Sequence, residues 1–218
     1  MGTADAAPEP CTADVAVDLS LVLAVDCSSS VDVADFKMQM DGIASALRDP
    51  SVHDAIAAGT RRQIALALVQ WSTSRSQALT LRWRIVSSQQ DLEEAAREIE
   101  SAGRQSYPGG TGLAAAVEYS VALLQASSVM AERRIIDVSG DGADNDGGNA
   151  ASARDQALAL GITINGLPIV YDSAYILTYY HDQVIGGADA FLEPAANMLS
   201  FREAMLRKLV REIGGMVS

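Results

Sequence analysis

The sequence predicts an α/β fold: a doubly wound, mostly parallel sheet with one antiparallel edge strand and helices on both faces. Two observations support this prediction. Apolar stretches of strand length alternate with stretches of helical periodicity, which favours a parallel sheet covered on both sides. Polar segments also follow several of these stretches, as is typical of the ligand-binding edge of such sheets. The chain has 218 residues, 49% of them hydrophobic, which is enough for one large domain.

The first strand is the most distinctive element. A mostly apolar run, Leu19–Val25, ends abruptly at Asp26. Ser28 and Ser30 follow at alternate positions, so a loop can turn all three polar side chains toward one point. The strand therefore delivers one acid and two hydroxyls to the place where it ends.

Periodicity and cap residues predict the other elements. Apolar residues at three- and four-residue steps, such as Phe36, Met40 and Ile43, indicate a helix, and Pro50 follows its end. Alternation between residues 77 and 86 indicates a strand with one exposed face, in a hairpin with the strand before it. The expected elements, in chain order, are strand Asp18–Asp26, helix Val31–Leu47, strand Arg62–Trp71, strand Gln77–Val86, helix Ser88–Ala102, helix Thr111–Leu124, strand Arg133–Val138, helix Asn149–Leu160, strand Ile162–Val170, helix Asp172–Asp182, short strand Ala190–Leu192 and helix Leu199–Ile213.

We expect a flexible tail over residues 1–16 and one domain over residues 17–218. The small, acidic, proline-containing start is typical of a mature secreted protein behind a cloning Met-Gly, so we expect a secreted or periplasmic protein whose signal peptide has been removed. A disulfide between Cys11 and Cys27 is not expected. A strand over Asp18–Asp26 would place Cys27 about 30 Å from its start, at ~3.3 Å per residue. The residues back to Cys11 reach at most about 24 Å. Whether Cys11 pairs with another chain stays open.

Composition narrows the possible partners. The net charge of −12 argues against a nucleic-acid or anionic-membrane surface, because binding phosphates needs a basic patch. No apolar run approaches the roughly 18 residues that span a membrane, so we expect no membrane insertion. The basic residues near the C-terminus are interpreted as a solvated helix face: Arg202, Arg207, Lys208 and Arg211. The oligomeric state stays open.

Three polar loops are expected at the carboxyl edge of the sheet: residues 26–30, 109–111 and 139–145. Together they offer two carboxylates and three hydroxyls, from Asp26, Asp141, Ser28, Ser30 and Thr111. All are hard oxygen donors of the kind that Mg²⁺ or Mn²⁺ prefers, and no nearby His or Cys pair suggests zinc. An ion held largely by neutral ligands stays electrophilic, so it attracts a carboxylate from outside.

These motifs resemble a known family. D-C-S-S-S fits the D-x-S-x-S signature of von Willebrand factor A domains, G-G-T-G-L-A-A-A-V resembles their threonine loop, and I-I-D-V-S-G-D-G resembles their strand followed by Asp-Gly. More narrowly, V-D-L-S-L-V-L-A-V-D, I-D-V-S-G-D-G-A-D-N, I-T-I-N-G-L-P-I and V-I-G-G-A-D-A-F resemble the uncharacterised bacterial DUF1194 family, a von Willebrand A-like group mostly found with secretion signals.

The resemblance implies a von Willebrand A, Rossmann-like fold with a metal-ion-dependent adhesion site (MIDAS). It implies that the five donors hold the ion directly or through water. A protein partner that offers Asp or Glu would complete the coordination across a rim formed by Gly110, Gly142 and Asp144. The chain would then be a binding module and not an enzyme. One departure is that Gly140 stands where the family pattern has threonine.

Three other functions fit the sequence less well. A Mg²⁺-dependent phosphoester hydrolase using Asp26 is the main alternative, although such an enzyme would want a second acid where this chain has Ser28. A metal-free loop network is another. A Rossmann cofactor site is disfavoured because the glycine pattern after the fourth strand is incomplete.

Several single residues are interpreted as structural. Serine hydrolysis lacks a G-x-S-x-G elbow, and the two histidines, His53 in an expected surface turn and His181 at the end of a helix, are expected to be surface or packing residues. Asp137 and Asn165 lie inside apolar strands and are expected to have buried hydrogen-bond partners. Asp144 and Asp146 are expected to face solvent or to lie behind the ligands, where they would contact the ligand residues but not the ion.

Overall fold

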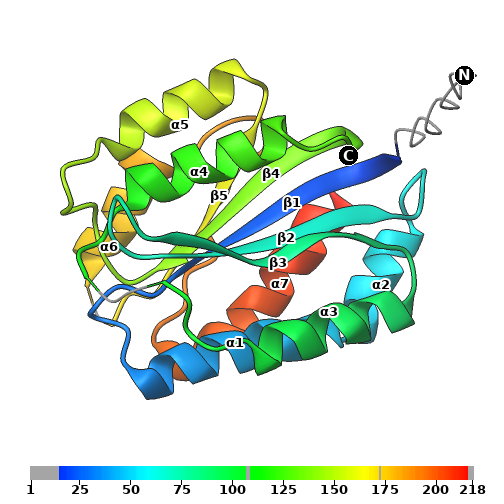
Figure 1. Ribbon diagram of the computed structural model, residues 1–218, viewed down its shortest axis with the longest axis horizontal. Helices are drawn as coiled ribbons and strands as arrows, with labels where there is room; N and C mark the ends of the chain where they lie inside the picture. Colours follow the sequence, from blue (N-terminus) through cyan, green and yellow to red (C-terminus); the bar gives the residue numbers. More distant parts are fainter. Residues whose placement is uncertain (1–14, 107–108, 172, 216–218) are drawn as a thin grey trace, which may run out of the picture.

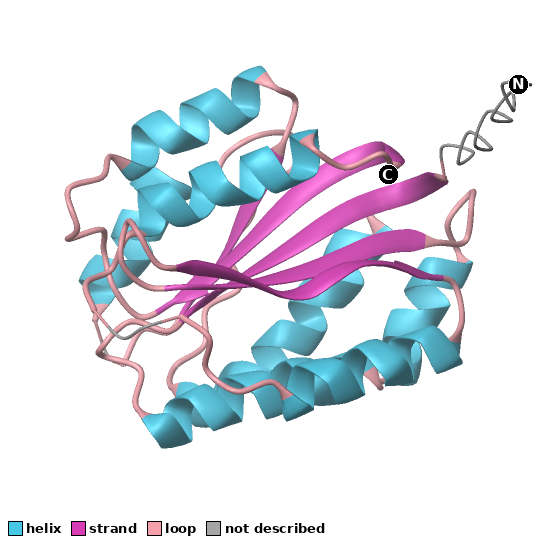
Figure 2. Ribbon diagram, viewed as in Figure 1, coloured by secondary structure: helices cyan, strands magenta, loops and turns pink. Residues whose placement is uncertain are grey.

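The computed structural model describes residues 15–106, 109–171 and 173–215. Five strands form one sheet between two layers of helices (Figures 1 and 2). The elements are β1 Ala16–Asp26, α1 Val33–Leu47, α2 Pro50–Ala57, β2 Ile64–Trp71, β3 Gln77–Val86, α3 Gln89–Ser101, α4 Leu113–Gln125, β4 Met130–Gly140, α5 Ala150–Ala159, β5 Thr163–Pro168, α6 Ala174–Tyr179, π-helix η1 Tyr180–Val184, 3-10 helix η2 Met198–Ser200 and α7 Phe201–Gly214.

The strand order is β3-β2-β1-β4-β5, with β3 antiparallel at one edge and the other pairs parallel. This confirms the predicted fold class. β1 is central, so its carboxyl end lies between the carboxyl ends of β2 and β4. The loops that follow β1 and β4 are therefore neighbours, on the left in Figure 1.

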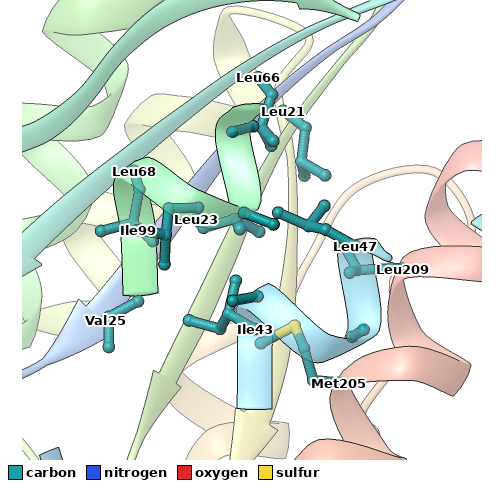
Figure 3. Packing of buried hydrophobic residues seen from close by; sticks show 14 of the residues in the cluster. Leu21, Leu23, Val25, Ile43, Leu47, Leu66, Leu68, Ile99, Met205 and Leu209 are labelled. Carbon is teal, nitrogen blue, oxygen red and sulfur yellow. The ribbon is translucent and has the colours of Figure 1, made fainter. Parts of the chain in front are cut away.

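Alternation along β1 divides the interior into two cores. Leu19, Leu21, Leu23 and Val25 face α1, α3 and α7. Figure 3 shows the packing of the last three of these side chains. Val22 and Ala24 face the opposite layer, which contains α4, α5 and η1. Since side chains alternate across a strand, Asp26 belongs to the second face. That face also carries Val138 of β4 and Ile164 of β5.

Some elements differ from the prediction. α2 was not expected, and His53 lies within it and not in a surface turn. Asp49 caps this helix and Pro50 occupies its first turn, a start signal that had been interpreted as the end of the preceding helix. The segment expected as strand Ala190–Leu192 forms only an isolated bridge, between Leu192 and Gly166.

The expected tail lies almost entirely outside the described residues, as does Cys11, and β1 already begins at Ala16. Cys27 is a buried free thiol. In the described part of the chain, no helix is long and apolar enough to cross a membrane.

A buried ionic cluster lies between the sheet and α7. Lys208 is fully buried, and its Nζ lies 2.7 Å from Asp137 Oδ1 and also contacts Glu212. Asn165 donates to Glu212 Oε1 at 2.9 Å, and its own Oδ1 accepts the backbone N–H of Phe191. Asn165 thus has the buried hydrogen-bond partners that were expected, whereas the buried partner of Asp137 is the ion pair with Lys208. The interpretation of Lys208 as part of a solvated face was wrong, because Lys208 is buried in the core and pairs there with Asp137 of β4.

Two neighbouring arginines of β4 cap helices on opposite faces. Arg133 donates to the carbonyl oxygens of Glu212 and Ile213 at the end of α7, at 2.6 and 2.7 Å. Arg134 donates to the carbonyl of Leu160 at the end of α5. Positive charge at a helix C-terminus is favourable, so this edge, opposite the carboxyl ends of the strands, is closed by charged caps.

Candidate functional site

The loops after β1 and β4 bring four of the predicted donors together. Asp26 Oδ1 accepts the backbone N–H of Ser28 at 2.7 Å. The hydroxyls of Ser28 and Ser30 lie 3.1 Å apart, and Ser30 Oγ donates to Asp141 Oδ1 at 2.6 Å. These four residues thus form a hydrogen-bonded chain of oxygen donors from the end of β1 to the end of β4, in which the link from Asp26 to Ser28 runs through a backbone N–H.

Thr111 joins this group from the loop over residues 109–111. A Cβ built on Gly142 would lie 3.2 Å from Thr111 Oγ1, which puts the threonine beside the residue that follows Asp141. Ser29 donates its backbone N–H to the carbonyl of Gly109 at 3.0 Å, which connects the loop after β1 to the loop over residues 109–111. All five predicted donors therefore lie at one edge of the sheet. Their role as ion ligands stays a prediction.

The donors are graded in exposure. Asp26 is 0% exposed, Ser28 1% and Thr111 5%, whereas Ser30 is exposed and Asp141 half-buried. Any ion or ligand would therefore enter from the side of Ser30 and Asp141, with Asp26 at the bottom.

Burial dominates the electrostatics of Asp26. The pKa of Asp26 is raised from 3.8 to about 7. Loss of hydration is the largest cause, the bonds from Ser28 oppose the rise, and the nearby charge of Asp141 adds to it. Asp26 Oδ2 has no hydrogen-bond partner among the described residues. A buried carboxylate oxygen without a partner is costly unless a cation supplies the missing interaction.

The donor set suits a hard cation. Carboxylate and hydroxyl oxygens match Mg²⁺ and Mn²⁺, and the partnerless Asp26 oxygen fits such an ion. No group of three or more His, Cys, Asp and Glu side chains that could hold a metal occurs in the described ranges. The present set contains only two carboxylates, because its other donors are hydroxyls.

Sequence reasoning missed two residues that shape the loops. Asn145 accepts the N–H of Thr111 through Oδ1 at 2.7 Å and donates its own N–H to the carbonyl of Thr111 at 2.9 Å. Arg104 donates to the carbonyls of Cys27, Val31 and Asp32 at 3.3, 2.7 and 3.0 Å, which fixes the turn after β1. Position was the available signal, since Asn145 ends the loop over residues 139–145 and Arg104 precedes the loop over residues 109–111.

The predicted rim residues occupy the same edge. Gly110 and Gly142 are half-buried beside Thr111. Asp144 is also half-buried, and its carboxylate accepts the N–H groups of Ala114, Asp146 and Gly148 at 2.8, 3.2 and 3.2 Å. Asp144 thereby caps α4, whose N-cap Gly112 has no side chain to do so. These contacts are to the backbone of α4 and of the loop that contains Asp144, so its expected place behind the ligands and its place in the rim both stay predictions.

An open groove of about 540 Å³ adjoins the donors. It is lined by Ser30, Asp35, Met38, Asp141, Tyr171, Asn197, Met198 and Leu199. Leu199 is 80% exposed and Tyr171 47%, so the groove offers apolar surface directly beside the exposed end of the oxygen chain.

Comparison with known proteins identifies the family. A family model described as "Protein of unknown function (DUF1194)" matches residues 16–217. The chain belongs to the DUF1194 family. No curated protein matches it.

Solved structures share the fold of this DUF1194 chain. A von Willebrand factor type A protein from Catenulispora acidiphila is 18% identical, with a TM-score of 0.64, over 93% of this chain and 44% of that one. The pilus adhesin SpaC from Lactobacillus rhamnosus GG is 13% identical, with a TM-score of 0.65, over 90% and 31%. Proximal thread matrix protein 1 from the mussel byssus, with a zinc-occupied MIDAS motif, is 13% identical, with a TM-score of 0.60, over 92% and 47%.

These likenesses show the von Willebrand A fold. The DUF1194 chain spans less than half the length of each of the three proteins, whose other parts have no counterpart in it.

Proposed function

We propose that this DUF1194 protein is a binding module that holds Mg²⁺ or Mn²⁺ at the carboxyl edge of its sheet. The observation that carries the proposal is the chain of oxygens from Asp26 through Ser28 and Ser30 to Asp141, with the partnerless carboxylate oxygen of Asp26 at its buried end. Thr111, beside Gly142, completes the donor set.

When bound, the ion would supply an electrophilic centre for a carboxylate of the partner. Asp26 and Asp141 would hold it with negative charge, and the hydroxyls of Ser28, Ser30 and Thr111 would add neutral donors. Ser30 and Asp141 are the accessible members of the set, so the partner's Asp or Glu would approach from their side. Gly110, Gly142 and Asp144 would form the rim around that approach.

The groove beside the site supports a protein as the partner. Its exposed apolar side chains, Tyr171 and Leu199, would contact residues next to the coordinating carboxylate. Burying apolar surface contributes about 25 cal/mol per Å², which would add affinity to a single coordination bond. Structural relatives named as a pilus adhesin and a byssus protein are consistent with such a role. They also support the proposal that the chain works outside the cytoplasm, as a secreted or periplasmic protein.

The alternative, phosphoester hydrolysis with Asp26 as nucleophile, has less support. A nucleophile must reach its substrate, and Asp26 is fully buried beneath Ser28. Turnover of an aryl phosphate that disappears in Asp26→Asn would reverse this preference.

Isothermal titration with Mg²⁺ and Mn²⁺ tests the metal site. The wild type should bind one ion, and Asp26→Ala and Asp141→Ala should lose that binding. Asp54→Ala is the matched control, because Asp54 has an 81% exposed side chain on α2 and takes no part in the site. Failure of the wild type to bind either ion, or equal binding by all variants, would disprove the assignment.

A further inference from the structure

We infer that Tyr180 is a positioning residue for the metal site, whose buried hydroxyl holds the carboxylate of Asp26 in place. This inference rests on the proposed function and deepens it. The Tyr180 hydroxyl lies beside position 140, where the family pattern has threonine and this chain has glycine.

Two buried oxygens at the site face the same small space. Asp26 Oδ2 and Tyr180 Oη belong to residues that are 0% exposed, and neither has a hydrogen-bond partner within residues 15–106, 109–171 and 173–215. A Cβ built on Gly140 would lie 2.8 Å from each of them. The two oxygens are therefore at most 5.6 Å apart, twice that distance. A small movement or one bridging water is enough to join them.

Two glycines of the sheet, Gly140 and Gly166, leave space for the Tyr180 side chain. A Cβ built on Gly166 of β5 would lie 2.9 Å from Tyr180 Cδ1, so the ring crosses the sheet over this glycine. Gly166 pairs with Val138 in β4, and Gly140, two residues on, faces the same side. Both positions must be glycine, because a Cβ closer than 3.0 Å would displace the ring or the hydroxyl. The glycine at 140 thus leaves room for a hydroxyl that arrives from another element.

The π-helix η1 sets the orientation of the Tyr180 side chain. Ile185 donates its N–H to the carbonyl of Tyr180 at 3.0 Å, closing the wide turn. The preceding residue, Tyr179, accepts the backbone N–H of Asp144 through its own hydroxyl at 3.2 Å. Two consecutive tyrosines therefore reach two parts of the site, Tyr179 the loop after β4 and Tyr180 the acid after β1. Single π-turns within helices are frequently found at functional sites.

A tyrosine hydroxyl suits this task chemically. It donates one hydrogen bond and carries no charge, so it favours the ionised form of Asp26 and leaves the negative charge available to a cation. An arginine or lysine in the same place would compete with the ion. Groups that hydrogen-bond to metal ligands fix their orientation, and their loss typically lowers metal affinity about 10–100-fold.

The test is Tyr180→Phe, which keeps the buried ring and removes only the hydroxyl. We expect Mn²⁺ affinity, measured by electron paramagnetic resonance titration, to fall about 10-fold or more. The melting temperature in EDTA should change little, because phenylalanine keeps the buried ring and the hydroxyl makes no direct hydrogen bond to a described residue in the structure. Tyr175→Phe, 64% exposed on α6, is the matched control and should bind Mn²⁺ like the wild type. The near-ultraviolet difference spectrum on adding Mn²⁺ should change in Tyr180→Phe but not in the control.

The outcomes separate the two proposals. Equal Mn²⁺ affinity in the wild type and Tyr180→Phe would overturn the role of Tyr180 and leave the metal site intact. A loss of affinity accompanied by a matching drop of the melting temperature in EDTA would assign Tyr180 to packing and also overturn it. A wild type that binds no Mn²⁺, or that binds it unchanged after Asp26→Ala, would overturn both proposals.

Discussion

Without a metal, Asp26 should destabilise the protein at neutral pH, and Asp26→Asn should stabilise it. The folded chain raises the pKa of this carboxyl from 3.8 to about 7, mainly by burial. Between these pH values the folded state binds a proton that the unfolded state has released, so stability falls as pH rises. At ~1.4 kcal/mol for each pH unit of the difference, the penalty is about 4 kcal/mol above pH 7 and absent below pH 4.

Asparagine should escape this penalty without losing the contacts of the aspartate. Its Oδ1 can still accept the N–H of Ser28. Its amide nitrogen would take the position of the partnerless oxygen beside Tyr180, whose hydroxyl can accept a hydrogen bond. The substitution removes the ionisation and keeps the shape of the side chain.

The measurement is urea unfolding in EDTA at a series of pH values from 4 to 8. Asp26→Asn should match the wild type at pH 4 and exceed it by about 4 kcal/mol at pH 8. Asp54→Asn, on an exposed side chain, is the control and should stay within about 0.5 kcal/mol of the wild type throughout. If Asp26→Asn is less stable than the wild type at pH 8, or if the two pH profiles are parallel, the reasoning is wrong.

Three further predictions follow from the interior. Lys208→Met should lower the free energy of unfolding in urea by about 3–5 kcal/mol, because it leaves two buried acids without their cation. The control Arg207→Met, at an exposed ion pair, should lower it by less than about 1 kcal/mol, and equal losses would contradict this prediction. Gly140→Ala should lower Mn²⁺ affinity about 10-fold, because its Cβ would lie 2.8 Å from two buried oxygens. The control Gly103→Ala has open space around its Cβ and should leave the Mn²⁺ affinity unchanged, so the same result for both variants would refute the steric argument. Burial raises the pKa of the Cys27 thiol to about 12, so a thiol reagent at pH 8 should modify it only after unfolding, and rapid labelling of the folded chain would speak against this.

The fold was predictable because local patterns and global arrangement agree. Apolar residues alternate in β1 according to the face they cover, and polar residues follow it where the strand ends. The same reasoning placed Asp26 and Asp141 at one edge, since parallel neighbours end together. The helix α2 was missed because Pro50 was interpreted as the end of one helix and not as the first turn of the next.

Long-range contacts could not be predicted in this way. The partner of Asp137 is Lys208, 71 positions away on a helix whose other basic residues face solvent. Tyr180 belongs to a tyrosine-rich helix with an ordinary pattern, and only the glycines at positions 140 and 166 show where its side chain goes. Such pairings depend on how strands and helices pack, which a one-dimensional pattern does not encode.

The arginine caps at the edge opposite the loops have a consequence for protein engineering. Arg133 and Arg134 anchor the ends of α7 and α5 to the same strand, one on each side of the sheet. These two arginine anchors thus lie at one pole of the molecule, and the polar loops lie at the other. Exchanging the loops for those of another sequence should leave the fastened pole undisturbed, so the chain could serve as a scaffold for grafted binding loops.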